Sequence, residues 1–444
     1  MMVQGPILLV ILLAAIGFIV LMTAKFRMHA FLVLLLTAFG VGLSSGMAPL
    51  QVIETISDGF GGTLGFIGIV IIAGTIIGTL LEKSRGTLTM ANTVLNLVGR
   101  ARSALAMAVT GAIVSIPVFC DSGFVILSSL NKSLAKKTNK SMAVMAVALS
   151  SGLYATHTLV PPTPGPIAAA GTVGADLGMV IMFGVVTAIP AITAGYLWAT
   201  RFASNYDIEP DIEIEENDTT NLPSPSEAFA PIVVPIILIA LKSVADFPSH
   251  PFGTGGVKTF FDFFGNPIVA LILGIFLGFR LIPKWSEEYI NGWVGEGLKN
   301  AATIIMITGA GGAFGAILGA TPIGDYLGSI LSQYNLGIFL PFIIAAALKT
   351  AQGSSTVALI TTASLVSPLL GDLGLTTEAA KALVVMSIGA GAMTMSHAND
   401  SYFWVVSQFS GMDTSTAYKT HSMATLVQGV TTIITVFILS LVFI

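Results

Sequence analysis

Charged residues are scarce in this chain, and cysteine is almost absent. Asp, Glu, Lys and Arg make up 9% of the 444 residues, whereas a soluble domain contains about 25%. This scarcity excludes an ordinary soluble fold. The single cysteine, Cys120, excludes an intrachain disulfide and a cysteine-based metal cluster. The hydrolase motifs HExxH and GxSxG are missing. We therefore expect a protein that is not an enzyme, with no cofactor, no bound metal and no nucleic-acid partner.

Apolar residues are abundant instead. They supply 54% of the chain and lie in runs of about 20 residues, the length of a helix that crosses a bilayer. The alternation of outer-membrane strands is absent, so the sequence predicts an all-α polytopic membrane protein. The first run lacks a basic leading region, so we expect a retained span and not a signal peptide. Ten crossings are expected, at 5–23, 30–47, 64–82, 141–160, 179–201, 229–246, 266–282, 298–319, 381–397 and 422–444.

Two pairs of polar interruptions break this apolar pattern. The first pair is 118–123 (VFCDSG) and 155–166 (ATHTLVPPTPGP); the second is 348–356 (LKTAQGSST) and 395–402 (MSHANDSY). Polar groups and unpaired backbone are costly in lipid and need a protein-lined or watery surrounding. We therefore expect two re-entrant helical hairpins, at about 103–131 and 336–370, and two broken helices, at about 141–166 and 381–402.

The basic residues predict the orientation of the chain. With the N-terminus outside, most Lys and Arg residues fall on the cytoplasmic side, and only Lys242, Lys258 and Lys381 fall outside. Both termini are then external. The acidic segment 203–228 reads as a cytoplasmic linker between a first half, 1–202, and a second half, 229–444. His421 lies near a predicted helix end, where we expect it at the membrane interface.

The two halves resemble each other in order. GLYATH at 152–157 is similar to GAMTMSH at 391–397, and Gly59 and Gly74 are spaced like Gly297 and Gly312. Membrane helices are generally rich in Gly and Ala, which is an alternative explanation of the similarity between the halves. That explanation does not predict polar breaks in matching order. The pattern favours two inverted repeats of five transmembrane helices each, as in secondary transporters with the site at the repeat interface.

Asp121 is the candidate for proton coupling. It follows Pro117 at the predicted tip of the first hairpin, beside the candidate binding residues Ser122 and Gly123. An ionised carboxylate is costly at membrane depth, and a carboxylate that changes charge with access to water is what proton coupling requires. The alternative is a structural acid satisfied by backbone N–H groups.

Lys349 is the one basic residue placed inside the membrane by this topology. Its ammonium and the exposed amides of the second hairpin suit an organic carboxylate. The alternatives are snorkelling to the outer interface or an internal salt bridge to Asp121 or Asp400. The hairpin tip adds four candidate binding residues: Gly353, Ser354, Ser355 and Thr356.

Two histidines occupy equivalent breaks in the two halves. Neutral imidazole binds hydroxyl groups, and imidazolium holds a carboxylate or carries a proton; a structural role is the alternative. Prolines follow His157 and an Asx-type break follows His397, so each break frees backbone carbonyls. We expect these breaks to contact a polyhydroxylated substrate through His157, Thr158, Thr163, His397, Asn399 and Asp400.

These motifs resemble those of the gluconate:proton symporter family, the gluconate permeases, within the wider ion-transporter superfamily. The shared phrases are GFGGTLG at 59–65, THTLVPPTPGP at 156–166, GSSTVALIT at 353–361 and SHANDSYFW at 396–404. The resemblance implies uptake of a sugar acid with protons across the bacterial inner membrane, by a homodimer in the lipid bilayer. Gluconate, glycerate and other aldonates are candidate substrates. A Na⁺-coupled carboxylate carrier or cation/proton antiporter, in which freed carbonyls bind the ion, is the alternative.

Overall fold

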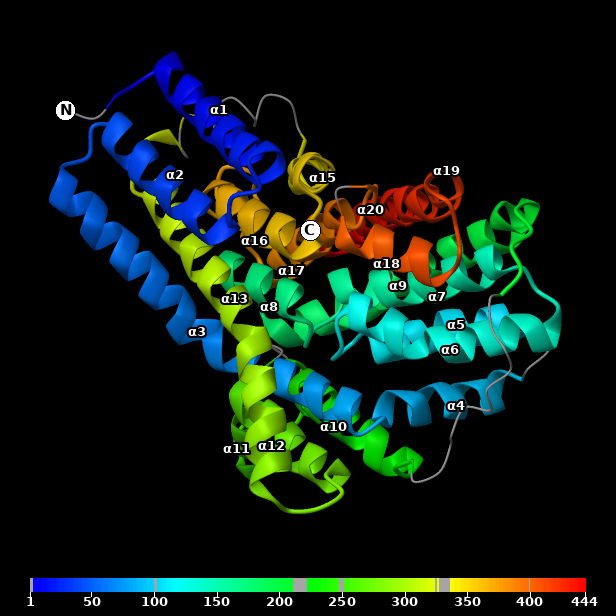
Figure 1. The fold of residues 1–444 in the computed structure, drawn as a ribbon. Helices are drawn as coiled ribbons and strands as arrows, with labels where there is room; N and C mark the ends of the chain where they lie inside the picture. The colour runs from blue at the N-terminus through cyan, green and yellow to red at the C-terminus, as the bar shows by residue number, and fades with distance from the viewer. Residues whose placement is uncertain are drawn as a thin grey trace.

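The computed structural model describes residues 3–99, 102–210, 222–246, 251–323, 326, 336–398 and 400–444. These residues form helices and loops without a strand, which confirms the all-α prediction (Figure 1). Part of the predicted linker, 211–221, lies outside the described residues.

The described residues of the first half form nine α-helices. They are α1 (Pro6–Val20), α2 (Ala30–Ser44), α3 (Pro49–Lys83), α4 (Gly86–Val98), α5 (Ser103–Val114), α6 (Cys120–Thr138), α7 (Met142–Leu159), α8 (Pro164–Val173) and α9 (Leu177–Arg201). The second half contains, among its described residues, α10 (Pro225–Ala245), α11 (Gly256–Phe264), α12 (Pro267–Gly278), α13 (Glu287–Gly319), α15 (Phe339–Gln352), α16 (Ser355–Val366), α17 (Glu378–Ala392), α18 (Ser401–Phe409), α19 (Thr414–Ala417) and α20 (Met423–Phe443).

Several helices have the length and hydropathy of a membrane span. Within the described residues, 6 helices meet both criteria, or up to 8 if each of two bent pairs is one span. The helices α2 and α17, at two further predicted crossings, have 15 residues each. At 1.5 Å per residue they extend only about 22 Å, less than the roughly 30 Å of a hydrocarbon core. The number of ten crossings stays a prediction.

The chain is interrupted where the polar segments predict interruptions. Residues 115–119 separate α5 from α6, and Gly353 and Ser354 separate α15 from α16. Residues 160–163 separate α7 from α8, and 393–400 separate α17 from α18. Proline lacks an N–H and clashes with the preceding helical turn, which explains the break before α8. At the second hairpin, Gly353 has φ of 87°, a left-handed conformation that ends α15.

In both halves a long helix (α3, α13) is followed along the chain by two interrupted helix pairs (α5/α6 and α7/α8; α15/α16 and α17/α18) and a terminal helix (α9, α20). The long helices α3 and α13 lie side by side and cross in Figure 1. A Cβ atom on Gly59 would lie 2.7 Å from the carbonyl oxygen of Gly312, and one on Gly297 would lie 2.9 Å from Cα of Ile76. Glycine at these two positions therefore lets the helices approach, and both glycines belong to the spacing that the halves share.

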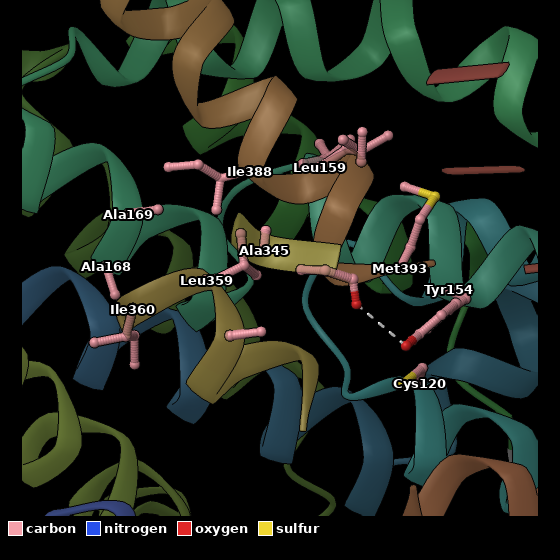
Figure 2. Close-up of a cluster of buried hydrophobic side chains, with 14 of the residues drawn as sticks. Cys120, Tyr154, Leu159, Ala168, Ala169, Ala345, Leu359, Ile360, Ile388 and Met393 are labelled. Carbon is pink, nitrogen blue, oxygen red and sulfur yellow. Dashed lines mark hydrogen bonds between the residues drawn. The ribbon is translucent and has the colours of Figure 1, made fainter. Parts of the chain in front are cut away.

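Apolar packing fixes the second hairpin against the broken helices. Figure 2 shows Leu359 and Ile360 of α16, Ala168 and Ala169 of α8 and Ile388 of α17 around a common centre. All five are almost completely buried. This packing places the hairpin tip at 353–354 next to α7, where the polar residues gather.

Candidate substrate site

Three helices begin at one cavity. The N-terminal ends of α6, α16 and α18 come from segments far apart in the sequence, yet all contribute to a cavity of about 260 Å³. Two residues of α7 complete the wall. The lining residues are Phe119, Cys120, Asp121, Tyr154, His157, Gly353, Ser354, Ser355, Thr356, Asp400, Ser401 and Tyr402. A helix N-terminus has unpaired N–H groups and a partial positive charge, so three of them together favour an anion.

Asp121 lies in the first turn of α6 and faces this cavity. Its Oδ1 atom is buried and has no hydrogen-bond partner within the described part of the chain. Buried polar atoms are nearly always paired. An unpaired carboxylate oxygen on a side chain that lines a cavity is therefore a candidate to take up a proton.

Lys349 is paired inside the protein and does not line the cavity. Its Nζ atom lies 2.6 Å from Oδ2 of Asp400, and the two side chains are 0% and 6% exposed. The ammonium also donates to the carbonyl oxygen of Gly353. Asp400 accepts two further hydrogen bonds, from the Ser396 hydroxyl at 2.6 Å and from the Tyr402 amide at 3.1 Å. The structure thus forms the internal salt bridge that the sequence left open as an alternative.

This pair leaves the local charge of the site balanced. A buried charge without a partner would be very unfavourable, and the hydrogen bonds to Asp400 reduce the desolvation penalty of the pair. Asp400 also caps α18, because its Oδ1 accepts from the backbone of Tyr402. The pair consequently ties the end of α15 to the beginning of α18.

Aromatic and hydroxyl groups form the remaining walls. The Tyr154 hydroxyl lies 2.7 Å from Oγ of Ser355 and 3.4 Å from the carbonyl oxygen of Ala392, and its ring stacks on Tyr402 at 5.2 Å. The His157 ring packs against Phe119 at 5.9 Å. His157 is 5% exposed, and its Nδ1 has no partner among the described residues. Hydroxyl and imidazole groups that face a cavity are suited to a hydroxylated ligand.

The structure brings together seven of the predicted site residues: Asp121, His157, Gly353, Ser354, Ser355, Thr356 and Asp400. Others lie outside this cavity. The hydroxyls of Thr158 and Thr163 donate to carbonyls one turn back, at 3.0 and 2.7 Å, because a buried threonine in or next to a helix readily bonds its own backbone. Gly123 lies against Leu153 and serves helix packing.

Two more predicted residues have other positions, and a third is not described. Ser122 lines a second cavity on the other side of the hairpin tip. The Nε2 atom of His397 lies 2.9 Å from the carbonyl oxygen of Thr350, away from the substrate cavity. Asn399 lies outside the described residues.

Sequence reasoning missed the aromatic wall and a buried histidine. Tyr154 belongs to the GLYATH phrase and lies three residues, about one helical turn, before His157, and this spacing was the available signal. The expectation for His421 was wrong. It is fully buried and lies 3.2 Å from the hydroxyls of both Ser150 and Ser396. The Ser396 hydroxyl donates to Asp400, so its oxygen accepts from Nε2 of His421.

The chain matches proteins of known family along almost its entire length. The family model described as "GntP family permease" matches residues 7–442. The chain is 35% identical to the gluconate permease of Pseudomonas aeruginosa, with 98% of both chains covered. It is 33% identical to the D-serine transporter DsdX of Escherichia coli K12, with 97% of both covered, and 31% identical to the low-affinity gluconate transporter of that strain, with 95% and 96% covered.

Solved structures share the fold at low sequence identity. The YdaH transporter of Alcanivorax borkumensis has a TM-score of 0.67 at 14% identity, with 92% of this chain and 96% of that chain covered. MtrF of Neisseria gonorrhoeae has a TM-score of 0.66 at 15% identity, with 94% and 97% covered. The family match and the full-length relatives confirm the resemblance found in the motifs: this chain belongs to the GntP family of permeases and is a multi-pass membrane transporter.

Proposed function

We propose that this permease is a proton symporter. It imports gluconate or a related hydroxylated monocarboxylate, such as glycerate, across the bacterial inner membrane by alternating access. The observation that carries the proposal is the cavity where three helices begin, with Asp121 in its wall. Pockets for drug-sized ligands span roughly 300–1,000 Å³, so a cavity of about 260 Å³ suits a small metabolite.

The charges around the cavity favour a monoanion. Each helix N-terminus carries about half a positive charge, so three contribute roughly +1.5 before screening. The charges of Lys349 and Asp400 cancel within their salt bridge. The net charge around the cavity therefore depends on Asp121, because this residue adds a negative charge only when it is ionised.

This arrangement couples a proton to the anion. An ionised Asp121 repels a substrate carboxylate in the same cavity, whereas a protonated Asp121 does not. Anion binding therefore favours protonation of Asp121, and protonation favours anion binding, as linkage requires. Release of the proton on the inner side weakens anion binding there, which drives import.

The substrate hydroxyls have partners of matching chemistry in this proposal. The carboxylate lies at the N-termini of α16 and α6, whose first backbone N–H groups have no carbonyl partner within their own helix. Hydroxyl groups contact His157, Ser354 and Thr356, and they displace the water that otherwise solvates these side chains. Tyr154 supplies an aromatic wall against the carbon chain.

A proteoliposome assay tests this function. Uptake of radiolabelled gluconate, glycerate, other aldonates and D-serine is measured under an inward proton gradient, and separately under an inward Na⁺ gradient at equal pH. The proposal expects accumulation of a hydroxy monocarboxylate with the proton gradient alone. Accumulation that requires Na⁺ would replace it with a Na⁺-coupled carrier.

D-serine is a second candidate substrate, because a relative of this chain transports it. A relative that is 33% identical over 97% of this chain is a D-serine transporter. Asp121 lines the cavity and offers a carboxylate for an ammonium group, whereas the Asp400 carboxylate is held by Lys349. Uptake of D-serine in preference to all hydroxy acids would establish this alternative.

We also propose the topology of two inverted halves, 1–202 and 229–444, with external termini and a homodimeric assembly. Single cysteines introduced at Lys136 and Lys258, in a Cys120→Ala background, test the orientation. A membrane-impermeant thiol reagent added to intact cells should label position 258 and not position 136. The reverse labelling would overturn the topology.

A further inference from the structure

A second cavity adjoins the first one at the tip of the first hairpin. It also measures about 260 Å³, and it is lined by Thr75, Gly78, Thr79, Glu82, Pro117, Val118, Phe119, Asp121, Ser122 and Asn300. Phe119 and Asp121 line both cavities. The beginning of α6 is therefore a partition that the two cavities share.

Asp121 is the titratable group of this partition. One of its oxygens, Oδ1, is buried without a hydrogen-bond partner in the described part of the chain. The side chain contributes to the walls of both cavities, so a proton on Asp121 has two adjacent spaces from which it can come and to which it can go. The charged groups that act on Asp121 are Lys349 and Asp400 on the substrate side.

The second cavity leads along α3 to another acid, Glu82. Glu82 is partly exposed, and Asn300 of α13, in the same wall, is exposed. This end of the cavity therefore lies near the protein surface. Lys83 and Glu296 are the charged side chains that act on Glu82, and they pair with each other at 2.9 Å. The basic-residue pattern puts Lys83 on the cytoplasmic side.

The wall between the two acids is polar enough for water. The hydroxyls of Thr75 and Thr79 donate to the carbonyl oxygens of Ile71 and Thr75, at 2.8 and 3.0 Å. Their oxygen lone pairs stay available to accept from water. A volume of about 260 Å³ far exceeds the roughly 15 Å³ that one water molecule needs.

We propose that this second cavity is the cytoplasmic proton exit of the transporter, separate from the substrate cavity, with Glu82 as the proton acceptor at its outer end. The proposal rests on the proton symport described above. The Asp121 carboxyl group gives its proton to a water molecule in the second cavity, and Asp121 becomes a carboxylate. That water chain passes a proton to the Glu82 carboxylate, and Glu82 then releases a proton to cytoplasmic water. The substrate leaves through the first cavity.

The test compares two transport modes in proteoliposomes. Proton-driven accumulation requires release of the proton, whereas counterflow exchange of labelled for unlabelled substrate requires no net proton movement. Glu82→Gln removes the acceptor. Thr79→Leu fills the second cavity with an apolar side chain. Glu54→Gln is the matched control, because Glu54 lies exposed on the same helix and lines neither cavity.

We expect Glu82→Gln and Thr79→Leu to lower the initial rate of proton-driven uptake at least tenfold, while exchange stays within twofold of the parent. Glu82→Asp, which keeps a carboxylate, should retain most of the uptake, and Glu54→Gln should change neither mode. Proton-driven uptake by Glu82→Gln within twofold of the parent would overturn the proposal. An equal loss of exchange would also overturn it, because the effect would then be structural.

Asp121→Asn separates this proposal from the function on which it rests. If Asp121→Asn abolishes proton-driven uptake while Glu82→Gln leaves it intact, symport through Asp121 stands and the exit route is wrong. If Asp121→Asn leaves proton-driven uptake intact, the symport proposal itself fails.

Discussion

Neutralising Asp121 provides the most direct test of how this transporter couples a proton to its substrate. Asp121→Asn keeps the size of the side chain and removes its negative charge. The variant should therefore behave as a carrier whose coupling group is permanently neutral. Substrate exchange should continue, and accumulation driven by a proton gradient should be lost.

The cavity dimensions set the size of the expected effect on binding. A sphere of the cavity volume, about 260 Å³, has a radius of about 4 Å, so we place the substrate carboxylate about 6 Å from Asp121. At an effective dielectric constant of about 20, repulsion between two carboxylates at that distance is about 3 kcal/mol. This corresponds to roughly 100-fold in Kd. In the parent protein, binding should tighten by up to that factor as the pH falls and Asp121 takes up a proton.

Binding of labelled substrate to the detergent-purified protein, measured across a pH series, checks this magnitude. The parent should show a pH-dependent Kd, and Asp121→Asn should show a low, pH-independent Kd. Asp121→Glu should keep the pH dependence, and Asp58→Asn, at an exposed position on α3, should match the parent. A parent Kd that is independent of pH, or proton-driven accumulation by Asp121→Asn, would refute the reasoning. Loss of both exchange and binding would assign Asp121 a binding or structural role instead.

Three further predictions concern stability, binding and access. Lys349→Met should lower the free energy of unfolding by about 3–5 kcal/mol, because it leaves Asp400 buried without its partner. In a thermal unfolding assay, Lys349→Met combined with Asp400→Asn should recover part of this loss. Additive losses from the two substitutions would contradict the pairing. His157→Ala should weaken substrate binding by about 1–3 kcal/mol, because a hydrogen bond to the ligand is lost. Thr158→Val should leave Kd unchanged, because the Thr158 hydroxyl bonds a carbonyl of its own helix. Equal effects of the two substitutions on Kd would remove His157 from the site. Cys120 is buried, so a small methanethiosulfonate reagent should react with it slowly and leave transport almost unchanged, as should Cys120→Ala; rapid inactivation that Cys120→Ala removes would show that this thiol is open to water.

The interruptions of the helices could be predicted because their causes are local. Proline at 161, 162 and 164 ends α7 whatever surrounds it, and Gly353 supplies the left-handed turn between α15 and α16. The cost of a charge in lipid likewise marks Asp121 and Lys349 from composition alone. Each of these signals is a property of a short stretch of sequence.

The rotation of each helix about its own axis and the contacts between distant segments could not be predicted from short stretches of sequence. Thr158 follows His157 directly, yet His157 lines the cavity, whereas the Thr158 hydroxyl donates to a backbone carbonyl of its own helix. His421 lies close to a predicted helix end, yet packing buries it against Ser150 and Ser396. The direction of a side chain at a break depends on how neighbouring helices pack.

The sequence by itself determined that this chain spans a membrane, where its helices break and which residues are costly at that depth, because hydropathy, proline and charge act over a few residues. The tertiary structure decided that the beginnings of α6, α16 and α18 meet at one cavity and that Lys349 is bound by Asp400. It also decided that Asp121 lies between two cavities. These are relations between segments that lie tens to hundreds of residues apart, and only the packing of the helices brings their atoms within reach of one another.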